Sequence, residues 1–383
     1  MPKTEPDQPD RHSVMPDTNS KPETPAIGEA ELKALHRQLQ QQHETIRHFE
    51  DPESGLQGII AIHDTTLGPG LGGVRMWPYD SPESALEDVK RLSRGMTYKA
   101  AVAGLEMGGG KAVIIGNPET DRCEPLFRAF GRQIDKLGGR YLTAKDVGVT
   151  VRDLEWIGME TPYVTGLPEE KGGSGDPSLM TAFGVYMGMK AAAKVAWGSD
   201  SLEGRSVAIQ GAGHVGHALA GHLADEGARI AVADINGELA NRAAKEHGAE
   251  VVPPSEIGRQ GAQIFSPCAL GGVINDHTIG ELTCEIVAGG ANNILQDEEK
   301  HGEALRQRDI LYAPDYVLNA GGIINISFER GGYDPQKARA KTEEIYNTVL
   351  LIFLRAGEQG IPTHQASARL AEERIWKERN RKK

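Results

Sequence analysis

The sequence predicts two α/β domains, the second built on a parallel, doubly wound sheet. The chain has 383 residues, more than a single hydrophobic core usually organises. After Arg205, short β-like runs and helical runs alternate, which is typical of a parallel sheet with helices on its faces. A Gly- and Pro-rich stretch at 166–177 separates this half from an earlier α/β half. We therefore expect a first domain at 26–176 and a second at 177–344, with a cleft between them.

Composition limits the kinds of partner that the chain can have. The formal net charge is −12, with 39% hydrophobic and 25% charged residues. These values are typical of globular proteins, whereas nucleic-acid binding usually needs a basic face. No run approaches the roughly 18 apolar residues of a membrane span, so neither a nucleic acid nor a membrane is expected as a partner. The three cysteines lack CxxC spacing, which predicts neither a disulfide framework nor a metal site and fits a reducing, cytoplasmic compartment.

The first half predicts alternating helices and strands. Residues 1–25 are rich in Pro, Asp, Glu, Thr and Ser and contain no apolar run, so we expect a disordered tail and not a signal peptide. The spacing of apolar residues predicts helices at 29–49, 84–94 and 124–137 and strands at 58–63, 111–115 and 140–143. A small-residue helix is expected at 179–195. The last segment, 345–383, predicts amphipathic helices with a basic end that return to the first domain.

A glycine fingerprint lies near the start of the second domain. Residues 206–210 predict a strand, 211–216 (GAGHVG) a GxGxxG turn, 217–226 a helix and 229–233 a second strand. In this pattern Gly211 allows the tight turn, Gly213 lets a pyrophosphate approach the backbone, and Gly216 lets helix and strand pack closely. The helix N-terminus attracts the phosphate charge.

An acidic residue completes the fingerprint. Asp234 follows the second strand, about 20 residues after Gly213, where a carboxylate binds the adenosine ribose. This carboxylate would repel a 2′-phosphate, and no arginine directly follows it. We therefore expect NAD as the cofactor in preference to NADP.

A glycine-rich segment of the first half contains Lys99 and Lys111, the second directly after three glycines. Backbone without Cβ atoms lets a ligand approach, and a lysine that loses hydration there has a lowered pKa and can exchange protons near neutral pH. Asp146 follows a predicted strand, where open α/β sheets present groups to ligands. Taken alone, the lysines could be solvated surface residues, and Asp146 could cap a turn or helix.

From about residue 55 onward the chain resembles the glutamate/leucine/phenylalanine/valine dehydrogenase family, and among its members the leucine-specific enzymes most. The resemblance rests on motifs in the family's order, at 68–75 (GPGLGGVR), 95–99 (GMTYK), 108–111 (GGGK), 143–148 (TAKDVG), 211–216, 266–272 (SPCALGG), 288–293 (AGGANN) and 313–322 (APDYVLNAGG). The chain departs from the pattern at Gly70, where alanine is frequent, and at Lys145, where an acidic residue is common. Lys145 adds positive charge beside Asp146 and could lower its pKa.

The resemblance implies a homo-oligomer that reversibly deaminates an L-amino acid to a 2-oxo acid, ammonium and NADH. It implies that Lys99 holds the substrate α-carboxylate. Lys111 and Asp146 would move protons as water adds to an imine and the carbinolamine collapses. Contacts to the cofactor are expected from nine residues: Gly211, Gly213, His214, Val215, Gly216, Asp234, Thr181, Ala269 and Asn292. Thr181, which would bind the nicotinamide carboxamide, could instead cap its helix.

Substrate contacts are expected from Leu71, Gly73, Ala144, Ile323 and Ile326. Glutamate-specific relatives carry a lysine at the position of Leu71, so a γ-carboxylate would be buried here without a partner. The apolar lining favours leucine, valine and isoleucine as substrates, although the two isoleucines could also be ordinary core. Two alternatives stay open: an aromatic amino acid dehydrogenase of the same family, and an NAD-binding regulator without activity.

Overall fold

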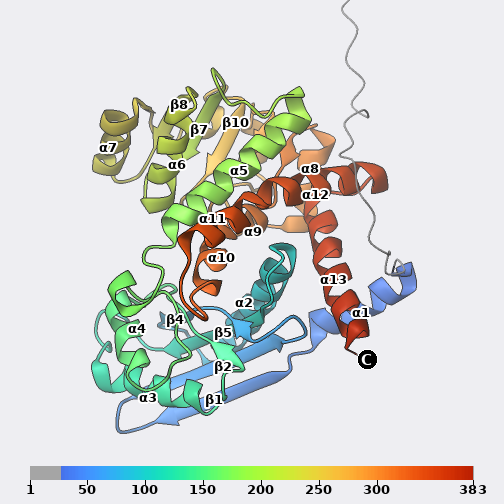
Figure 1. The fold of residues 1–383 in the computed structure, drawn as a ribbon. Helices are drawn as coiled ribbons and strands as arrows, with labels where there is room; N and C mark the ends of the chain where they lie inside the picture. Colours follow the sequence, from blue (N-terminus) through green and yellow to red (C-terminus); the bar gives the residue numbers. More distant parts are fainter. Residues whose placement is uncertain (1–26, 383) are drawn as a thin grey trace, which may run out of the picture.

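Two six-stranded sheets organise the computed structural model, which describes residues 27–382 (Figure 1). Helices pack on both sheets, so the predicted α/β class is confirmed. The tail predicted at 1–25 lies outside the described residues.

The first sheet is mixed and runs β1-β2-β5-β3-β6, with β4 also paired to β5. Its strands are β1 (Thr45–Asp51), β2 (Leu56–Asp64), β3 (Gly70–Leu71), β4 (Val74–Trp77), β5 (Gly108–Ile115) and β6 (Tyr141–Leu142). Helices α3 (Glu124–Asp135) and α4 (Val151–Gly158) share an apolar cluster with one set of strand side chains. Helix α2 (Pro82–Val102) shares another with Ile59, Ala61 and Val113. The two clusters follow from the alternation of side chains along β2 and β5.

The structure corrects the helix predicted at 29–49. Helix α1 ends early (Glu29–Gln41), and residues Thr45–Asp51 form the edge strand β1. This strand pairs antiparallel to β2 and buries Phe49, whose ring centroid lies 5.7 Å from that of Phe130. Strand pairing and aromatic packing, which are tertiary effects, outweigh the local helical pattern.

The helix predicted at 84–94 is longer in the structure and carries Lys99 in its last turn. Ser81 caps its start, Pro82 occupies its first position, and Gly104, with a φ of +71°, follows its end.

The strand predicted at 111–115 begins at Gly108, so the three glycines belong to β5. A Cβ on Gly109 would lie 2.1 Å from Thr97 Oγ1 of α2, and a Cβ on Gly110 would lie 2.6 Å from Cδ2 of Tyr141. The glycines therefore let α2 and Tyr141 pack against the strand, which corrects the expectation that they leave room for a ligand.

The second sheet is parallel throughout and runs β12-β11-β10-β7-β8-β9, which confirms the predicted doubly wound sheet. Its strands are β7 (Ser206–Gln210), β8 (Arg229–Ala233), β9 (Glu250–Val251), β10 (Ile264–Pro267), β11 (Ile286–Val287) and β12 (Leu311–Tyr312). The strand order reverses between β7 and β10, and doubly wound sheets bind ligands at such a switch point.

The remaining helices accompany the second sheet or follow it. They are α5 (Ser178–Trp197), α6 (His214–Asp225), α7 (Gly237–His247), α8 (Glu298–Gln307), α9 (Asp315–Leu318), α10 (Gly321–Ser327), α11 (Pro335–Glu343), α12 (Ile345–Gln359) and α13 (Thr363–Arg381). Every helix in the described part of the chain is too short or too polar to span a bilayer.

The C-terminal helices connect the second sheet with the Lys99 helix. Helix α12 packs on α5, and α13 packs on α1, α2 and α8, as Figure 1 shows. Arg374 of α13 donates a hydrogen bond to the carbonyl of Ala101 at 2.9 Å. Tyr98 Oη donates to Glu372 Oε1 at 2.7 Å. Helix α13 thus holds the turn of α2 that carries Lys99.

Candidate active site

Lys111 and Asp146 form an ion pair, with 2.9 Å between Nζ and Oδ2. Lys111 lies on β5 with its side chain 8% exposed, which excludes a solvated surface lysine, and Asp146 lies in the loop after β6. Burial alone would raise the pKa of Asp146, but the cations of Lys111 and Arg75 outweigh burial and lower it. Asp146 is therefore an ionised carboxylate at neutral pH.

Arg75 is a member of this group that the sequence analysis did not single out. From β4, its Nε donates to Asp146 Oδ2 at 3.1 Å and its Nη1 to Asp88 Oδ2 at 2.9 Å. An arginine that ends a glycine motif on a buried strand requires carboxylate partners, and this signal was available in the sequence. Lys145 is exposed, and the cations that act most strongly on Asp146 are Lys111 and Arg75.

Gly73 brings the segment that follows Leu71 against Asp146. A Cβ at this position would lie 2.6 Å from the carbonyl oxygen of Lys145 and 3.0 Å from Asp146 Cβ. Any side chain here would push β4 away from the ion pair, so Gly73 is required for the close approach.

Lys99 reaches from the first sheet's domain to the second. Its Nζ donates to Asn292 Oδ1 at 3.2 Å, and Asn292 lies in the loop after β11. The same oxygen accepts a hydrogen bond from Asn319 Nδ2 at 3.0 Å. Burial lowers the pKa of Lys99 to about 8; Asp315 opposes this shift and Lys111 adds to it. Lys111 and Asp146 both act on the pKa of Lys99, which indicates that the three charged groups lie near one another.

Asp315 is a second group that the sequence analysis missed. It begins α9, is 3% exposed, and its Oδ2 accepts a hydrogen bond from the backbone N–H of Ile294 at 2.7 Å. Burial raises its pKa, while this hydrogen bond and Lys99 act against the increase. Acidic residues are rarely buried unless they have a partner. An acidic residue within the apolar motif 313–322 was therefore the sequence signal for a buried, partnered carboxylate.

The apolar residues expected around the substrate side chain are all buried. Leu71, Ala144, Ile323 and Ile326 are 0, 5, 6 and 8% exposed and belong to one apolar cluster. Because Leu71 and Ala144 come from the first sheet's domain and the isoleucines from α10, this cluster joins both domains. Such burial fits the wall of an apolar pocket as well as ordinary core.

The predicted dinucleotide turn adopts the expected form between β7 and α6. Gly211 has a φ of +103°, Gly213 is the N-cap of α6, and a Cβ on Gly216 would lie 1.9 Å from the carbonyl oxygen of Gly211. A Cβ on Gly213, in contrast, would have no described atom within 4 Å. The turn therefore leaves space at the residue where the fingerprint places a pyrophosphate.

Other residues expected at the cofactor surround this turn. Ala269 Cβ would lie 2.7 Å from a Cβ on Gly211. A Cβ on Gly290, in the Asn292 loop, would lie 2.8 Å from Val215 Cγ1. His214 is exposed, and its Nδ1 lies 2.9 Å from Asp176 Oδ2.

Thr181 does not cap α5, contrary to the alternative given above. Its hydroxyl donates to the carbonyl of Pro177 at 2.9 Å. A Cβ on Gly322 would lie 2.8 Å from its Oγ1, which places Thr181 against the start of α10, the helix that carries Ile323 and Ile326.

Asp234 reaches back to the glycine turn. Its Oδ2 accepts a hydrogen bond from the N–H of Ala212 at 2.7 Å, and its Oδ1 accepts one from the N–H of Asn236 at 2.8 Å. Each carboxylate oxygen keeps a lone pair for a ribose hydroxyl. The residues present therefore fit an adenine dinucleotide.

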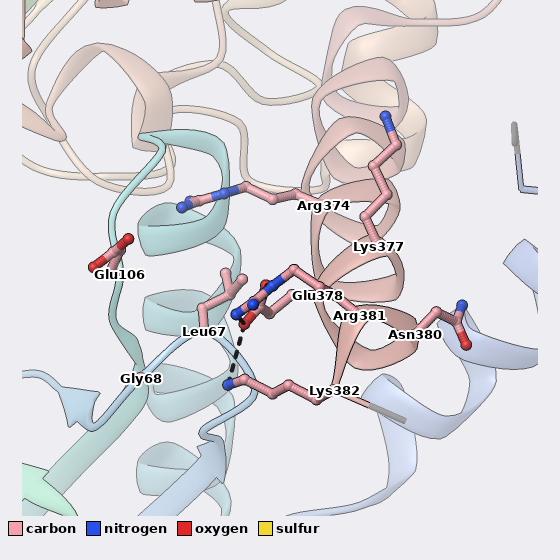
Figure 2. A pocket seen from close by; sticks show the side chains of 9 residues that line it. All are labelled: Leu67, Gly68, Glu106, Arg374, Lys377, Glu378, Asn380, Arg381 and Lys382. Carbon is pink, nitrogen blue, oxygen red and sulfur yellow. Dashed lines mark hydrogen bonds and ion pairs between the residues drawn. The ribbon is translucent and has the colours of Figure 1, made fainter. Parts of the chain in front are cut away.

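A cavity of about 940 Å³ lies beside α13, and none of the residues predicted for the site lines it (Figure 2). Basic side chains surround it, but Glu378 lies 2.7 Å from Arg381 and 3.3 Å from Lys382. Arg374 is bound to the carbonyls of α2. Because most of these charges are already paired, the cavity offers little to a charged ligand.

The two halves of the chain match the two family models of one enzyme family. Residues 40–163 match "Glu/Leu/Phe/Val dehydrogenase, dimerisation domain", and residues 172–247 and 237–382 match "Glutamate/Leucine/Phenylalanine/Valine dehydrogenase". This chain belongs to the Glu/Leu/Phe/Val dehydrogenase family. It is therefore an amino acid dehydrogenase that uses a nicotinamide dinucleotide, and the alternative of an inactive regulator is set aside.

Relatives in the Glu/Leu/Phe/Val dehydrogenase family differ in the substrate that their names give. A leucine dehydrogenase from Geobacillus stearothermophilus is 56% identical over 87% of this chain and 90% of its own length. A valine dehydrogenase from Streptomyces virginiae is 47% identical over 90% of this chain and 97% of its own. The crystal structure of L-tryptophan dehydrogenase from Nostoc punctiforme has a TM-score of 0.79 and 45% identity, covering 91% of this chain and 99% of that one.

Proposed function

We propose that the protein catalyses the reversible, NAD-dependent oxidative deamination of branched-chain L-amino acids to 2-oxo acids, ammonium and NADH. The observation that carries the proposal is the grouping of Lys99 with the Lys111–Asp146 ion pair, next to the apolar cluster that contains Leu71 and Ala144. One cation can hold a carboxylate while a base and an acid act on the adjoining carbon and nitrogen.

Lys99 binds the substrate α-carboxylate in this proposal. Its ammonium is partly buried, so a carboxylate that arrives beside it meets a weakly hydrated cation. The bound anion raises the pKa of Lys99 above the value of about 8 in the free protein. Asn292 holds Lys99 Nζ in position from the opposite domain.

Lys111 and Asp146 move the protons. A bound nicotinamide would supply the acceptor for the hydride that the substrate Cα loses. The ionised carboxylate of Asp146 accepts a hydrogen bond from the substrate amine, and Lys111 Nζ takes a proton from the water that adds to the imine carbon. That proton passes to the nitrogen, the C–N bond breaks as ammonia departs, and the ammonia takes the hydroxyl proton of the carbinolamine, which gives the 2-oxo acid and ammonium. The two groups stand 2.9 Å apart, close enough to exchange a proton.

The cofactor in this proposal is NAD. Asp234 stands at the end of β8, and the next four residues, 235–238, contain no cation. A ribose 2′-hydroxyl can donate to this carboxylate, whereas the 2′-phosphate of NADP would be repelled by it. His214, Val215, Thr181 and Ala269 complete the proposed cofactor contacts.

Branched-chain substrates are favoured by the proposed side-chain pocket of Leu71, Ala144, Ile323 and Ile326, with the Gly73 backbone at its edge. An apolar pocket discriminates neighbours by only about 1–3 kcal/mol per methylene, so leucine, valine and isoleucine should all react. The names of the leucine and valine dehydrogenases above support this substrate class.

The proposal also covers the domain boundaries, the oligomeric state and the cellular compartment. Residues 26–176 would form the substrate domain, to which 345–383 return, and 177–344 the NAD domain, with substrate held in a cleft between them. A homo-oligomer is supported by the description of the model that matches 40–163 as a dimerisation domain. Three free thiols fit a reducing cytoplasm.

The test is NADH formation by the purified chain with leucine, valine, isoleucine, phenylalanine, tryptophan and glutamate, beside Lys111→Ala and with NADP in place of NAD. We expect branched-chain turnover with NAD, reduced by about 10²–10⁴ in the variant. Preferred turnover of phenylalanine or tryptophan would overturn the pocket assignment. A fully active Lys111→Ala protein would overturn the proton-transfer role.

A further inference from the structure

A cluster of potential metal ligands lies apart from the residues of the proposed reaction. His217 is on α6, and Glu246 and His247 are the last two residues of α7. One ligand atom from each lies within 4.8 Å of the other two, and this is the one such group of three within residues 27–382. Because 217 and 246–247 are distant in sequence, no local spacing motif predicts this cluster.

The contacts inside the cluster leave one imidazole nitrogen without a partner. His217 Nε2 lies 2.9 Å from Glu246 Oε2. His247 Nε2 is buried and has no hydrogen-bond partner among residues 27–382. An unsatisfied imidazole nitrogen next to a histidine–carboxylate pair is unusual, because buried polar atoms normally find partners. A metal ion would satisfy all three side chains together.

The backbone provides the room for this arrangement. A Cβ on Gly221 would lie 3.3 Å from His247 Cε1, so the imidazole of His247 rests on α6 one turn beyond His217. The two imidazole centroids are 4.6 Å apart with planes inclined by 64°. Ligands held about 2.0–2.2 Å from one zinc ion stand roughly 3.4 Å apart when tetrahedral. His217 Nε2 and Glu246 Oε2 already stand 2.9 Å apart, and the half-exposed side chain of Glu246 leaves room for adjustment.

We propose that His217, Glu246 and His247 bind a divalent transition-metal ion of the zinc class. Two imidazoles and one carboxylate suit Zn²⁺, Ni²⁺ or Cu²⁺, whereas Mg²⁺ and Ca²⁺ require oxygen ligands. Arg242 is the cation that opposes binding, but its Nε stands 4.0 Å from the other oxygen of Glu246.

The ion would join two helices of the dinucleotide half. His217 directly follows Gly216 of the glycine turn, and α7 follows Asp234. A metal bridge between α6 and α7 therefore stabilises the segments on which the proposed pyrophosphate and ribose contacts lie. This consequence does not depend on which amino acid the enzyme uses.

Calorimetric titration of metal-stripped full-length protein with Zn²⁺, without nucleotide or amino acid, tests the site. We expect one equivalent to bind the parent chain and affinity to fall at least tenfold in His247→Ala and Glu246→Gln. Matched controls are Glu238→Gln, an exposed acid on the same helix, and His48→Ala, an exposed histidine of β1. Both should bind as the parent does.

Thermal unfolding provides a second measurement that separates binding from folding. Zn²⁺ should raise the Tm of the parent chain and of both controls, since a ligand of the native state stabilises it. Without metal, His247→Ala should unfold at the parent's temperature and show no increase on Zn²⁺ addition. Equal Zn²⁺ binding by parent and cluster variants, or no stoichiometric binding by the parent, would overturn the proposal.

Discussion

Asp146 Oδ2 stands 2.9 Å from Lys111 Nζ and also accepts a hydrogen bond from Arg75. One carboxylate oxygen is thus shared between a lysine that can give up its proton and an arginine that cannot. Both cations lower the pKa of Asp146.

Replacing Arg75 by methionine should move the acidic limb of the pH profile to higher pH. The pKa of Asp146 is lowered in the native protein, so its ionised form is complete above the ordinary value of about 3.9 and is lost as pH falls through the lower native pKa. Without Arg75 the native pKa rises and activity is lost earlier on acidification. The measurement is kcat/KM against pH.

Arg91→Met is the matched control for that experiment. Arg91 pairs with Asp88 at 2.7 Å, as Arg75 also does, but not with Asp146. The acidic limb of the Arg91→Met pH profile should coincide with that of the parent protein. An equal shift in Arg75→Met and Arg91→Met would contradict a specific effect of Arg75 on Asp146. Arg75→Met should also lower the free energy of unfolding by about 1–3 kcal/mol, because a hydrogen-bonded, partly buried charge is lost.

Substrate affinity should depend on pH through Lys99. The pKa of free Lys99 is about 8, and a bound carboxylate raises it. The affinity for the amino acid is therefore greatest below about pH 8. It decreases as pH rises from there to the higher pKa of Lys99 in the substrate complex. KM for leucine, or the inhibition constant of an unreactive branched carboxylic acid, should increase over this interval.

A Lys99→Met variant should bind the carboxylic acid weakly and without that pH dependence. If the inhibition constant of the variant followed the same pH curve as the parent's, another group would be responsible.

Gly73→Ala should reduce kcat strongly, and its effect on the stability of the fold should be smaller. The new methyl group would meet Lys145 O at 2.6 Å and Asp146 Cβ at 3.0 Å, which forces the ion pair apart. Gly95→Ala is the control, since a Cβ there has no described atom within 4 Å and alanine favours its helix. We expect kcat to fall at least tenfold in the first variant and to be unchanged in the second.

Gly213→Ala should weaken NAD binding without loss of Tm. Its Cβ would meet no described atom within 4 Å, so the methyl group occupies only the space assigned to the pyrophosphate. Gly216→Ala should lower both the NAD affinity and the Tm, because its Cβ would lie 1.9 Å from Gly211 O. Cofactor affinity followed by NADH fluorescence and Tm by calorimetry distinguish the two, and unchanged affinity in Gly213→Ala would contradict the assignment.

Local sequence patterns predicted the parts of the molecule whose chemistry is local. The glycine turn, the strands on either side and Asp234 form one continuous segment, and their physical roles follow from residue type and spacing. Lys99, Lys111 and Asp146 could be named because each lies in a recognisable motif.

The contacts that organise the site were not predictable in the same way. Arg75 and Asp146 are 71 residues apart, and Lys99 and Asn292 are 193 apart. Edge strand β1 was mistaken for helix because its pairing with β2 is a tertiary contact. The glycines before Lys111 were assigned to a ligand, whereas α2 lies against Gly109 and Tyr141 lies against Gly110.

The hydrogen bond between Tyr98 and Glu372 spans 274 residues. At a synthesis rate of about 5–20 residues per second, Glu372 is translated roughly 15–55 s after Tyr98. Until then the turn of α2 with Lys99 lacks the helix that covers it, and a nascent chain exposes apolar surface. Production of this enzyme should consequently be sensitive to chaperone supply and to ribosome pausing within the last helix, even when the finished protein is stable.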